Sequence, residues 1–141
     1  MNKNIINKLL SLSESIHLLY VEDNINIRET TGAILKRFFQ NLYIADDGEE
    51  GLKLFRENSI DLVITDINMP NMDGLQMSQE IKKINSDIEI IITSAFNEEE
   101  YMKKSQKIGI NTYLYKPLEL EQLIDTLSKT LQEMKEREVL A

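Results

Sequence analysis

Residues 61–74 read DLVITDINMPNMDG, a run of apolar residues that stops at a charged residue, Asp66, and then enters a turn. The β-branched valine and isoleucine before the charge favour a strand over residues 61–65, and the proline and glycine behind it favour a turn. A buried charge is unfavourable unless it has a partner. The stretch therefore predicts a strand that carries a carboxylate to one edge of a sheet, where other groups must compensate it.

Outward from this strand, short apolar stretches alternate with segments whose apolar residues recur three and four positions apart. The short stretches predict strands, and the three- and four-residue spacing predicts helices. The other predicted strands are residues 16–21, 42–45, 88–93 and 112–115. Helices are predicted between the strands, including one that Asn97 caps and Gly109 ends, and a last helix begins at Leu118. Five strands that alternate with five helices predict an α/β fold, a doubly wound parallel sheet with helices on both faces.

Two helical segments extend this plan at its ends. Residues 1–14 carry apolar side chains at helical spacing, which predicts an extra N-terminal helix that docks on the domain or on a partner. The final helix carries apolar residues at alternating spacings of four and three, namely Leu120, Ile124, Leu127, Leu131 and Met134. This stripe has two interpretations, a core-facing side of the helix or a short coiled-coil seam that pairs two chains.

The composition is that of one soluble globular domain, and it argues against several classes of function. The 141 residues carry 16 Lys and Arg against 24 Asp and Glu, and the net charge of −8 disfavours nucleic acid and anionic lipid as partners. The chain has no cysteine, which excludes thiolate metal sites. No apolar run reaches the roughly 18 residues of a membrane helix, and no signal peptide is evident. We therefore expect a cytoplasmic protein that binds neither nucleic acid nor membranes directly.

Charged and hydroxyl side chains follow four of the predicted strands. Ligands of a parallel sheet bind outside the carboxyl ends of its strands. The residues at those ends are Glu22 and Asp23 after the first strand, Asp66 after the third, Ser94 after the fourth and Lys116 after the fifth. Each residue alone has a structural explanation: a helix cap, a turn, a satisfied hydroxyl or a surface cation. Their convergence at one edge instead predicts a shared site.

The three carboxylates at this edge point to a bound cation. Carboxylates within about 4 Å repel by several kcal/mol unless a cation lies among them. Oxygen ligands without His or Cys favour Mg²⁺, with Asp23 and Asp66 as direct ligands and Glu22 bound through water. A carboxylate beside Mg²⁺ can attack phosphorus and form an acyl phosphate. Lys116 and the hydroxyl of Ser94 then match the remaining phosphoryl oxygens.

This ordered set of residues resembles the receiver domains of two-component signalling, the response regulator domains typified by chemotaxis regulators. The matching motifs are Glu22-Asp23, Asp66 with Met69-Pro70 and Asp73-Gly74 behind it, Ser94-Ala95 and Lys116-Pro117. The resemblance covers about residues 15–136. It implies a flavodoxin-like sheet of strand order 2-1-3-4-5, with residues 1–14 as an N-terminal extension and residues 137–141 as a tail or the start of a linker.

The resemblance also implies a chemistry for the site. Asp66 would accept a phosphoryl group from a bacterial histidine kinase or histidine phosphotransfer protein, and the domain itself would catalyse both this phosphorylation and its own dephosphorylation. The backbone carbonyl of Asn68 would complete the Mg²⁺ shell, and the peptide bond before Pro117 would be cis. The only histidine, His17, lies inside a predicted strand and is expected to be a core or edge residue, not a phosphodonor.

A switch is the next implication of the resemblance. Ser94 would bond a phosphoryl oxygen, and Tyr113, which matches the family's switch aromatic, would turn inward; the alternative for Tyr113 is an ordinary strand aromatic. The face made by the helix before Gly109, strand 112–115 and the final helix would then signal to an output domain, a docking partner or a second copy of the chain. Asn68 and Phe96 occupy positions that tune dephosphorylation, and we expect the bulk of Phe96 to slow hydrolysis.

Three other functions share parts of this pattern. A haloacid-dehalogenase-type phosphatase also uses a strand-end aspartate, but it needs an acid two residues later, where this chain has Asn68. A flavodoxin-like nucleotide binder needs a phosphate-binding loop after the first strand, where Glu22 and Asp23 would repel phosphate. A degenerate receiver that acts as a phosphorylation-independent interaction module is the third, and the intact set of site residues argues against it.

Overall fold

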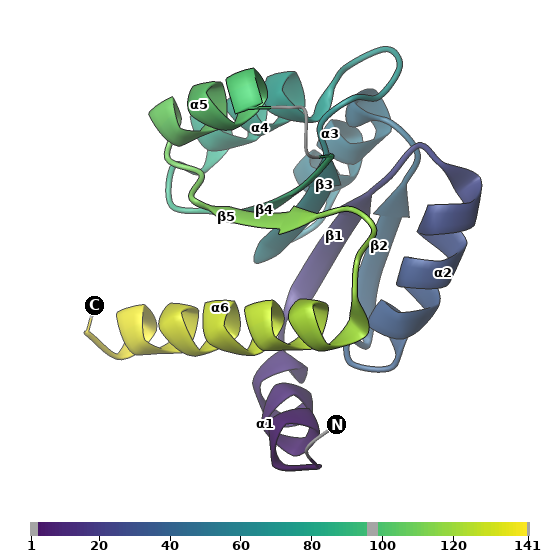
Figure 1. Ribbon diagram of the computed structural model, residues 1–141. Coiled ribbons are helices and arrows are strands. Elements are labelled where there is room, and N and C mark those ends of the chain that lie inside the picture. The colour runs from purple at the N-terminus through teal and green to yellow at the C-terminus, as the bar shows by residue number, and fades with distance from the viewer. Residues whose placement is uncertain (1–2, 96–98, 141) are drawn as a thin grey trace.

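The protein, described by a computed structural model over residues 3–95 and 99–140, is a parallel sheet between two layers of helices (Figure 1). The strands are β1 (His17–Val21), β2 (Asn41–Ala45), β3 (Leu62–Asp66), β4 (Glu89–Ser94) and β5 (Thr112–Tyr115). The helices are α1 (Lys3–Ser13), α2 (Ile25–Lys36), α3 (Gly48–Glu57), α4 (Gly74–Ile84), α5 (Glu99–Lys107) and α6 (Leu120–Leu140). The alternation predicted from the sequence is confirmed, although the proposed cap Asn97 lies outside the described residues.

The sheet has the strand order β2-β1-β3-β4-β5, and all neighbouring strands are parallel, as the resemblance implied. The chain moves outward from β1 to β2 and then returns to β3 on the other side of β1, so the order reverses between β1 and β3. Strands β3 and β4 each extend one residue beyond the predicted end, because Asp66 stays in register with Thr93 and Ser94 with Tyr115. Two predicted site residues therefore belong to the sheet itself.

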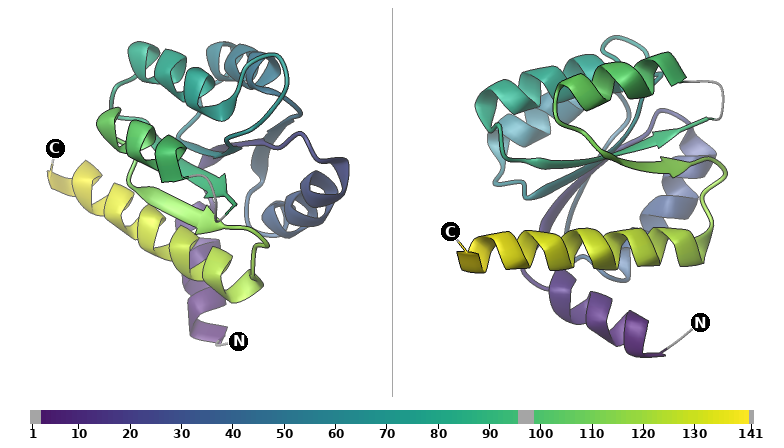
Figure 2. Two further views of the ribbon diagram at one scale, coloured as in Figure 1. Left: turned by 45° about the horizontal axis from the view of Figure 1, so that its top comes forward. Right: turned by 60° about the vertical axis from the view of Figure 1, so that its left-hand side comes forward.

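Helices cover both faces of the sheet (Figure 2). Apolar residues of α3, α4 and α5 pack on one face, and those of α1, α2 and α6 pack on the other. Consecutive residues of β1 alternate between the two layers, since Leu18 and Tyr20 join the second cluster whereas Leu19 and Val21 join the first. Burial on both faces explains why the strands are almost continuously apolar.

The N-terminal helix α1 docks on the domain, which was one of the two possibilities expected from the sequence. It packs against α6 (Figure 1), and its Leu9 is completely buried with residues of α2, α6 and the sheet. The buried Ser13 donates a hydrogen bond from Oγ to the carbonyl of Phe38, just beyond α2, at 2.5 Å. The N-terminal helix therefore packs as part of this fold, on the same side of the sheet as α2 and α6.

The apolar stripe of α6 faces the core, which decides between its two interpretations. Ile124, Leu127 and Leu131 are buried, whereas Leu120 is 45% exposed. The three buried side chains pack against other residues of the same chain, so they do not form an exposed coiled-coil seam. The helix continues to Leu140, and Arg137 near its end forms an ion pair with Glu89 of β4 at 2.9 Å. None of the helices in the two described ranges is long and apolar enough to cross a membrane.

Candidate metal and phosphoacceptor site

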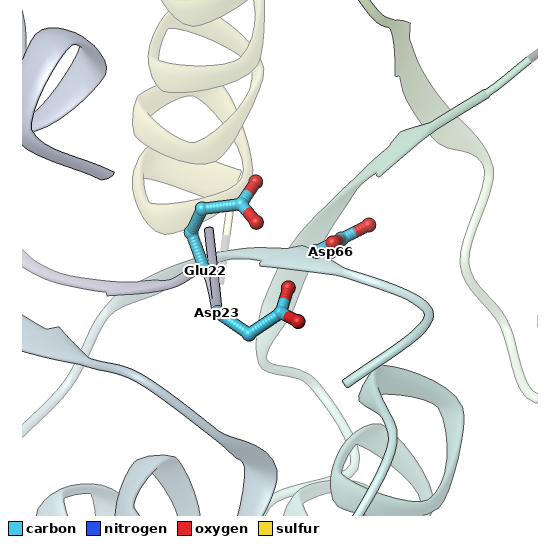
Figure 3. A group of neighbouring side chains, drawn as sticks. All are labelled: Glu22, Asp23 and Asp66. Atoms are coloured by element: carbon cyan, nitrogen blue, oxygen red, sulfur yellow. The ribbon is translucent and has the colours of Figure 1, made fainter. Parts of the chain in front are cut away.

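The carboxyl ends of the central strands bring the three predicted acids together (Figure 3). Glu22 and Asp23 follow β1, and Asp66 is the last residue of the neighbouring β3. One carboxylate oxygen from each of the three residues lies within 4.8 Å of the others. Glu22 and Asp66 are buried and Asp23 is exposed, so the cluster lies at the rim of the sheet with one side open to solvent.

Lys116 is the cation that the buried pair contacts. Its Nζ lies 2.9 Å from Glu22 Oε1 and 3.0 Å from Asp66 Oδ2. The peptide bond between Lys116 and Pro117 is cis, as expected. The backbone amide of Lys116 also donates to the carbonyl of Ser94 at 2.8 Å, which ties the start of the β5–α6 connection to the end of β4. One ammonium thus bridges two acids, whereas the sequence suggested only that it would lie near the phosphoryl group.

Burial and pairing act in opposite directions on the ionisation of these groups. Burial raises the pKa of Glu22 and of Asp66, and the hydrogen bonds from Lys116 oppose that rise without cancelling it. Burial alone would lower the pKa of Lys116, but its hydrogen bonds to the two acids raise the pKa above the ordinary value. The lysine therefore stays protonated, while ionised carboxylates at this edge remain less favourable than carboxylates in water.

The connection after β1 leaves Asp23 available to the cluster. Asn24, not Asp23, caps α2, because its side chain accepts a hydrogen bond from the amide of Ile27 at 3.0 Å. The amide of Asn24 donates to Glu22 Oε2 at 3.2 Å and helps to hold that carboxylate. Within the described parts of the chain, the carboxylate of Asp23 takes part in no hydrogen bond or ion pair with another side chain. The structural explanation that Asp23 is only a cap does not hold.

The connection after β3 is packed tightly beneath Asp66. The amide of Ile67 donates to Asp66 Oδ1 at 2.8 Å, and the amide of Gly74 donates to the carbonyl of Ile67 at 2.7 Å. A Cβ atom on Gly74 would lie 1.8 Å from the carbonyl oxygen of Asp66, so only glycine fits. Asn71 adopts a left-handed conformation with φ of 68° and donates to Asp47 Oδ2 at 2.8 Å. These contacts fix the loop that contains the exposed Asn68.

The two predicted switch residues lie on neighbouring strands. Ser94 ends β4, is completely buried and donates from Oγ to the carbonyl of Ala95 at 2.9 Å. Tyr113 of β5 is half-buried, and its hydroxyl lies 2.6 Å from Ser105 Oγ of α5 and 2.7 Å from the carbonyl of Ile110. Tyr113 thus has hydrogen-bond partners away from the carboxyl edge. Phe96 lies outside the described residues.

Comparisons with known proteins decide the family. A family model for the response regulator receiver domain matches residues 18–128. This chain belongs to the response regulator receiver domain family. It is 33% identical over 114 residues to the chemotaxis protein CheY of Halobacterium salinarum, a match that covers 81% of this chain and 95% of the relative.

Two further similarities are to a longer regulatory protein and to a solved domain. This receiver domain is 35% identical over 118 residues to the transcriptional regulatory protein ZraR of Escherichia coli K12, covering 84% of this chain and 27% of ZraR. The chain thus spans about a quarter of that relative. The crystal structure of the N-terminal domain of an uncharacterized protein from Wolinella succinogenes is similar with 35% identity and a TM-score of 0.80, covering 88% of this chain and 99% of that domain. Family membership removes the dehalogenase-type phosphatase and the nucleotide binder from consideration.

The donor groups of this receiver domain fit a small hard cation. The three clustered side chains offer only oxygen atoms, and no nitrogen or sulfur ligand accompanies them in the cluster found among the described residues. The exposed Asp23 leaves one side of the cluster accessible to water, which suits Mg²⁺ because that ion keeps several water ligands. The acidic cluster is therefore compatible with Mg²⁺.

Sequence reasoning missed several residues that support the site of this receiver domain. Arg28, Asp47 and Asn71 each hold a loop that follows a strand end. One signal was available, since Arg28 is a cation near the start of a predicted helix, where the helix dipole disfavours positive charge. The contact between Asp47 and Asn71 joins residues 24 positions apart, and no local pattern predicts it.

Proposed function

We propose that this receiver domain accepts a phosphoryl group on Asp66 from a histidine kinase or a histidine phosphotransfer protein, in a Mg²⁺-dependent reaction. One observation carries the proposal. The buried carboxylate of Asp66 lies 3.0 Å from the ammonium of Lys116 and within 4.8 Å of two further carboxylates, at the carboxyl edge of a parallel sheet. A structural ion pair with Lys116 requires only one acid. The two additional acids are explained if they bind a cation beside a nucleophilic carboxylate.

The proposed transfer is a displacement at phosphorus. A carboxylate oxygen of Asp66 forms the new bond to phosphorus, and the bond from phosphorus to the imidazole nitrogen of the donor breaks, with the electron pair leaving on that nitrogen. The product is an acyl phosphate on Asp66 and a free histidine on the donor. Lys116 moves its hydrogen bond from Asp66 to a phosphoryl oxygen, and Ser94 turns its hydroxyl to another. Hydrolysis reverses the modification when water attacks phosphorus and the carboxylate of Asp66 leaves.

The ligands of the proposed metal come from two connections. Asp23 and Asp66 would bind Mg²⁺ through their carboxylates, the exposed Asn68 through its backbone carbonyl, and Glu22 through water. When bound, the ion supplies positive charge to the phosphoryl oxygens and offsets the repulsion among the acids. Lys116 already bridges Glu22 and Asp66. Because this ion pair holds the Glu22 carboxylate, Glu22 is better placed to bind the metal through a water molecule than to be a direct ligand.

The proposed signal leaves the site through Ser94 and Tyr113. When the hydroxyl of Ser94 turns to the phosphoryl group, Tyr113 gives up its contacts with α5 and turns toward the vacated space. The face formed by α5, β5 and α6 then changes, and we propose that an output domain, a docking partner or a second copy of the chain binds there.

We also propose that residues 15–136 form the receiver, that residues 1–14 and 137–141 are its extensions, and that the protein acts in the cytoplasm. At the positions of Asn68 and Phe96 we propose tuning of hydrolysis.

The test is to incubate the intact chain with acetyl phosphate and Mg²⁺ and to measure its mass. The expected result is one added phosphoryl group in the parent protein, none in Asp66→Asn, and none when EDTA replaces Mg²⁺. Phosphoramidate serves as a second small donor, because its nitrogen leaving group resembles phosphohistidine. A folded parent protein that gains no mass with either donor contradicts the proposal and favours the phosphorylation-independent interaction module.

A further inference from the structure

We propose that Arg28 is a positioning residue for the metal site, which holds the backbone of Glu22 and Asp23 so that the Asp23 carboxylate faces Asp66. This inference rests on the proposed function, because it concerns how the chain prepares the Mg²⁺ site. Arg28 projects from α2 and does not belong to the acidic cluster itself.

The contact consists of one guanidinium nitrogen and two consecutive carbonyls. Nη1 of Arg28 donates to the carbonyl of Glu22 at 2.9 Å and to the carbonyl of Asp23 at 3.2 Å. Hydrogen bonds from a charged donor are roughly twice as strong as neutral ones. The two carbonyls belong to the two peptide planes that flank the Cα of Asp23. Holding both of them fixes the backbone of Asp23, and that backbone sets the direction in which the Asp23 side chain leaves.

The fold of α2 delivers Arg28 to this place. Asn24 caps the helix, and the amide of Arg28 donates to the carbonyl of Asn24 at 2.9 Å, which closes the first helical turn. Side chains of a helix lean toward its N-terminus. A long side chain one turn into α2 therefore reaches back over the cap to the loop that precedes it.

The position is unfavourable for a cation unless the cation has another role. The positive end of the helix dipole disfavours Lys and Arg in the first turn. α2 begins at Ile25, so Arg28 lies in that turn, and no acidic residue of the same turn compensates it. The carbonyls of the acidic loop provide the compensation instead.

Asp23 depends on this contact more than Glu22 does. Glu22 is held by Lys116, by the amide of Asn24 and by its own amide, which donates to the carbonyl of Ala45 at 3.1 Å. The carboxylate of Asp23 is exposed and, among the described residues, has no side-chain partner. Its orientation is therefore set through the backbone, and Arg28 is the side chain that holds that backbone.

Two explanations for Arg28 predict opposite effects on Mg²⁺ affinity. A positive charge near the cluster repels Mg²⁺, so if Arg28 acted only through its charge, Arg28→Gln would tighten binding and Arg28→Lys would leave it unchanged. If Arg28 positions the loop, Arg28→Gln weakens binding, and Arg28→Lys weakens it to a smaller extent because a lysine does not reproduce the planar guanidinium donors.

The experiment is titration of Mg²⁺ into the intact chain by isothermal calorimetry, with thermal unfolding in EDTA as the measure of folding. We expect the Kd of Arg28→Gln to rise about tenfold or more, the range typical of residues that support metal ligands. The matched control is Arg37→Gln, which removes the same charge from the exposed C-cap position of α2. It should change the Kd less than about threefold, because salt screens a single exposed charge at the far end of the helix. A purely structural role would lower the unfolding temperature in EDTA and leave the Kd of the folded protein unchanged.

The outcomes separate this inference from the proposed function. A parent protein that binds Mg²⁺ while Arg28→Gln binds it equally or more tightly overturns the positioning role alone. A folded parent protein that does not bind Mg²⁺ overturns the proposed function and this inference with it. If Arg28→Gln does not fold, Arg28→Lys decides: weaker binding supports the positioning role, and binding equal to that of the parent overturns it.

Discussion

Replacing the phosphoacceptor with its amide, Asp66→Asn, is expected to stabilise the metal-free protein. The substitution keeps the size of the side chain and removes one negative charge from the cluster. The physical reason is that the pKa of Asp66 is raised by burial despite the hydrogen bond from Lys116, so the ionised carboxylate is less favourable in the folded protein than in the unfolded chain. The amide carries no such penalty.

The magnitude follows from the distances in the cluster. At an effective dielectric constant of about 20, a charged carboxylate 4.8 Å away repels an ionised Asp66 by about 3.5 kcal/mol, so two fully charged neighbours at that distance would together repel it by about 7 kcal/mol. Attraction to Lys116 at 3.0 Å offsets about 5.5 kcal/mol of this. The net electrostatic energy of the ionised Asp66 carboxylate is then unfavourable by about 1.5 kcal/mol. Solvent around the exposed Asp23 makes this energy smaller, and desolvation of Asp66 makes it larger. We expect the free energy of unfolding to rise by about 1–2 kcal/mol.

The assay is urea unfolding followed by far-ultraviolet circular dichroism at pH 7.5, in EDTA and in Mg²⁺. Asp125→Asn, an exposed acid of α6, is the control and should change stability by less than about 0.5 kcal/mol. Mg²⁺ at a hundredfold excess over its Kd stabilises the parent by about 2.7 kcal/mol and Asp66→Asn by less, because the variant lacks a ligand. The advantage of the variant should therefore shrink or reverse in Mg²⁺.

The pH dependence has a definite sign. A folded-state pKa above the unfolded value means that protonated Asp66 contributes stability at low pH, and that this contribution is lost as the pH rises through the folded-state pKa. The difference between variant and parent should accordingly decrease as the pH falls toward the unfolded-state pKa of about 3.9. An Asp66→Asn protein that is less stable than the parent in EDTA at pH 7.5 would refute the reasoning, because Lys116 would then outweigh both neighbouring acids.

Three further substitutions test the packing around the site and the docking of α1, each by the free energy of unfolding in urea. Gly74→Ala should lose about 3 kcal/mol because its Cβ would lie 1.8 Å from the carbonyl oxygen of Asp66, and a stable variant would contradict the tight loop. Asp47→Ala should lose about 1 kcal/mol through the lost cap of α3 and the bond from Asn71. Hydrogen bonds from an α3 backbone amide and from Asn71 lower the pKa of Asp47, so this loss should be present at neutral pH and vanish as the pH falls through that pKa; a loss that persists at pH 2 would argue against it. Ser13→Ala should lose about 1–3 kcal/mol by leaving a carbonyl at the end of α2 without its partner, and an unchanged stability would show that α1 docks through apolar contacts alone.

The position of the site could be predicted from the sequence because it follows from local patterns. Each strand is short and apolar, each strand end is marked by a polar residue, and parallel strands must present their carboxyl ends on one edge. Glu22 and Asp66 are therefore neighbours in any sheet of this order, whereas Lys116 follows β5, which β4 separates from β3, and reaches them through its long side chain. The sequence could not predict that the Lys116 ammonium contacts both Glu22 and Asp66, because these contacts depend on side-chain directions that tertiary packing sets.

The connections were less predictable than the strands. Asp23 and Asn24 are both good helix caps, and propensity does not rank one above the other. The structure uses Asn24, and the reason lies in the phase of the helix: α2 begins at Ile25, so the residue directly before it is the one whose side chain reaches the first free amides. The carboxylate of Asp23 is thereby left for the cluster. A difference of one residue separates a cap from a candidate metal ligand.

The stripe on α6 illustrates the limit of periodicity. Spacings of four and three describe both a coiled-coil seam and the buried side of a helix that packs on a sheet. Here Ile124, Leu127 and Leu131 pack on the sheet and on α1, whose Leu9 is completely buried beside them. The choice depended on a partner helix more than 100 positions earlier in the chain. No window of the sequence around α6 contains that information.

The hydrogen bonds of Tyr113 set a scale for the proposed switch. In this structure its hydroxyl lies within hydrogen-bond distance of Ser105 Oγ and of the carbonyls of Met102 and Ile110, and a turn of the ring gives up all three contacts. A buried polar group without a partner costs about 1–3 kcal/mol, and a hydrogen bond to a charged group contributes about 1.5–3 kcal/mol. The bond that Ser94 would make to the phosphoryl group is therefore of the same size as the loss at Tyr113. Phosphorylation biases the two states only by the difference between these terms, so under the proposed function the switch is graded, with both orientations of Tyr113 populated before and after transfer.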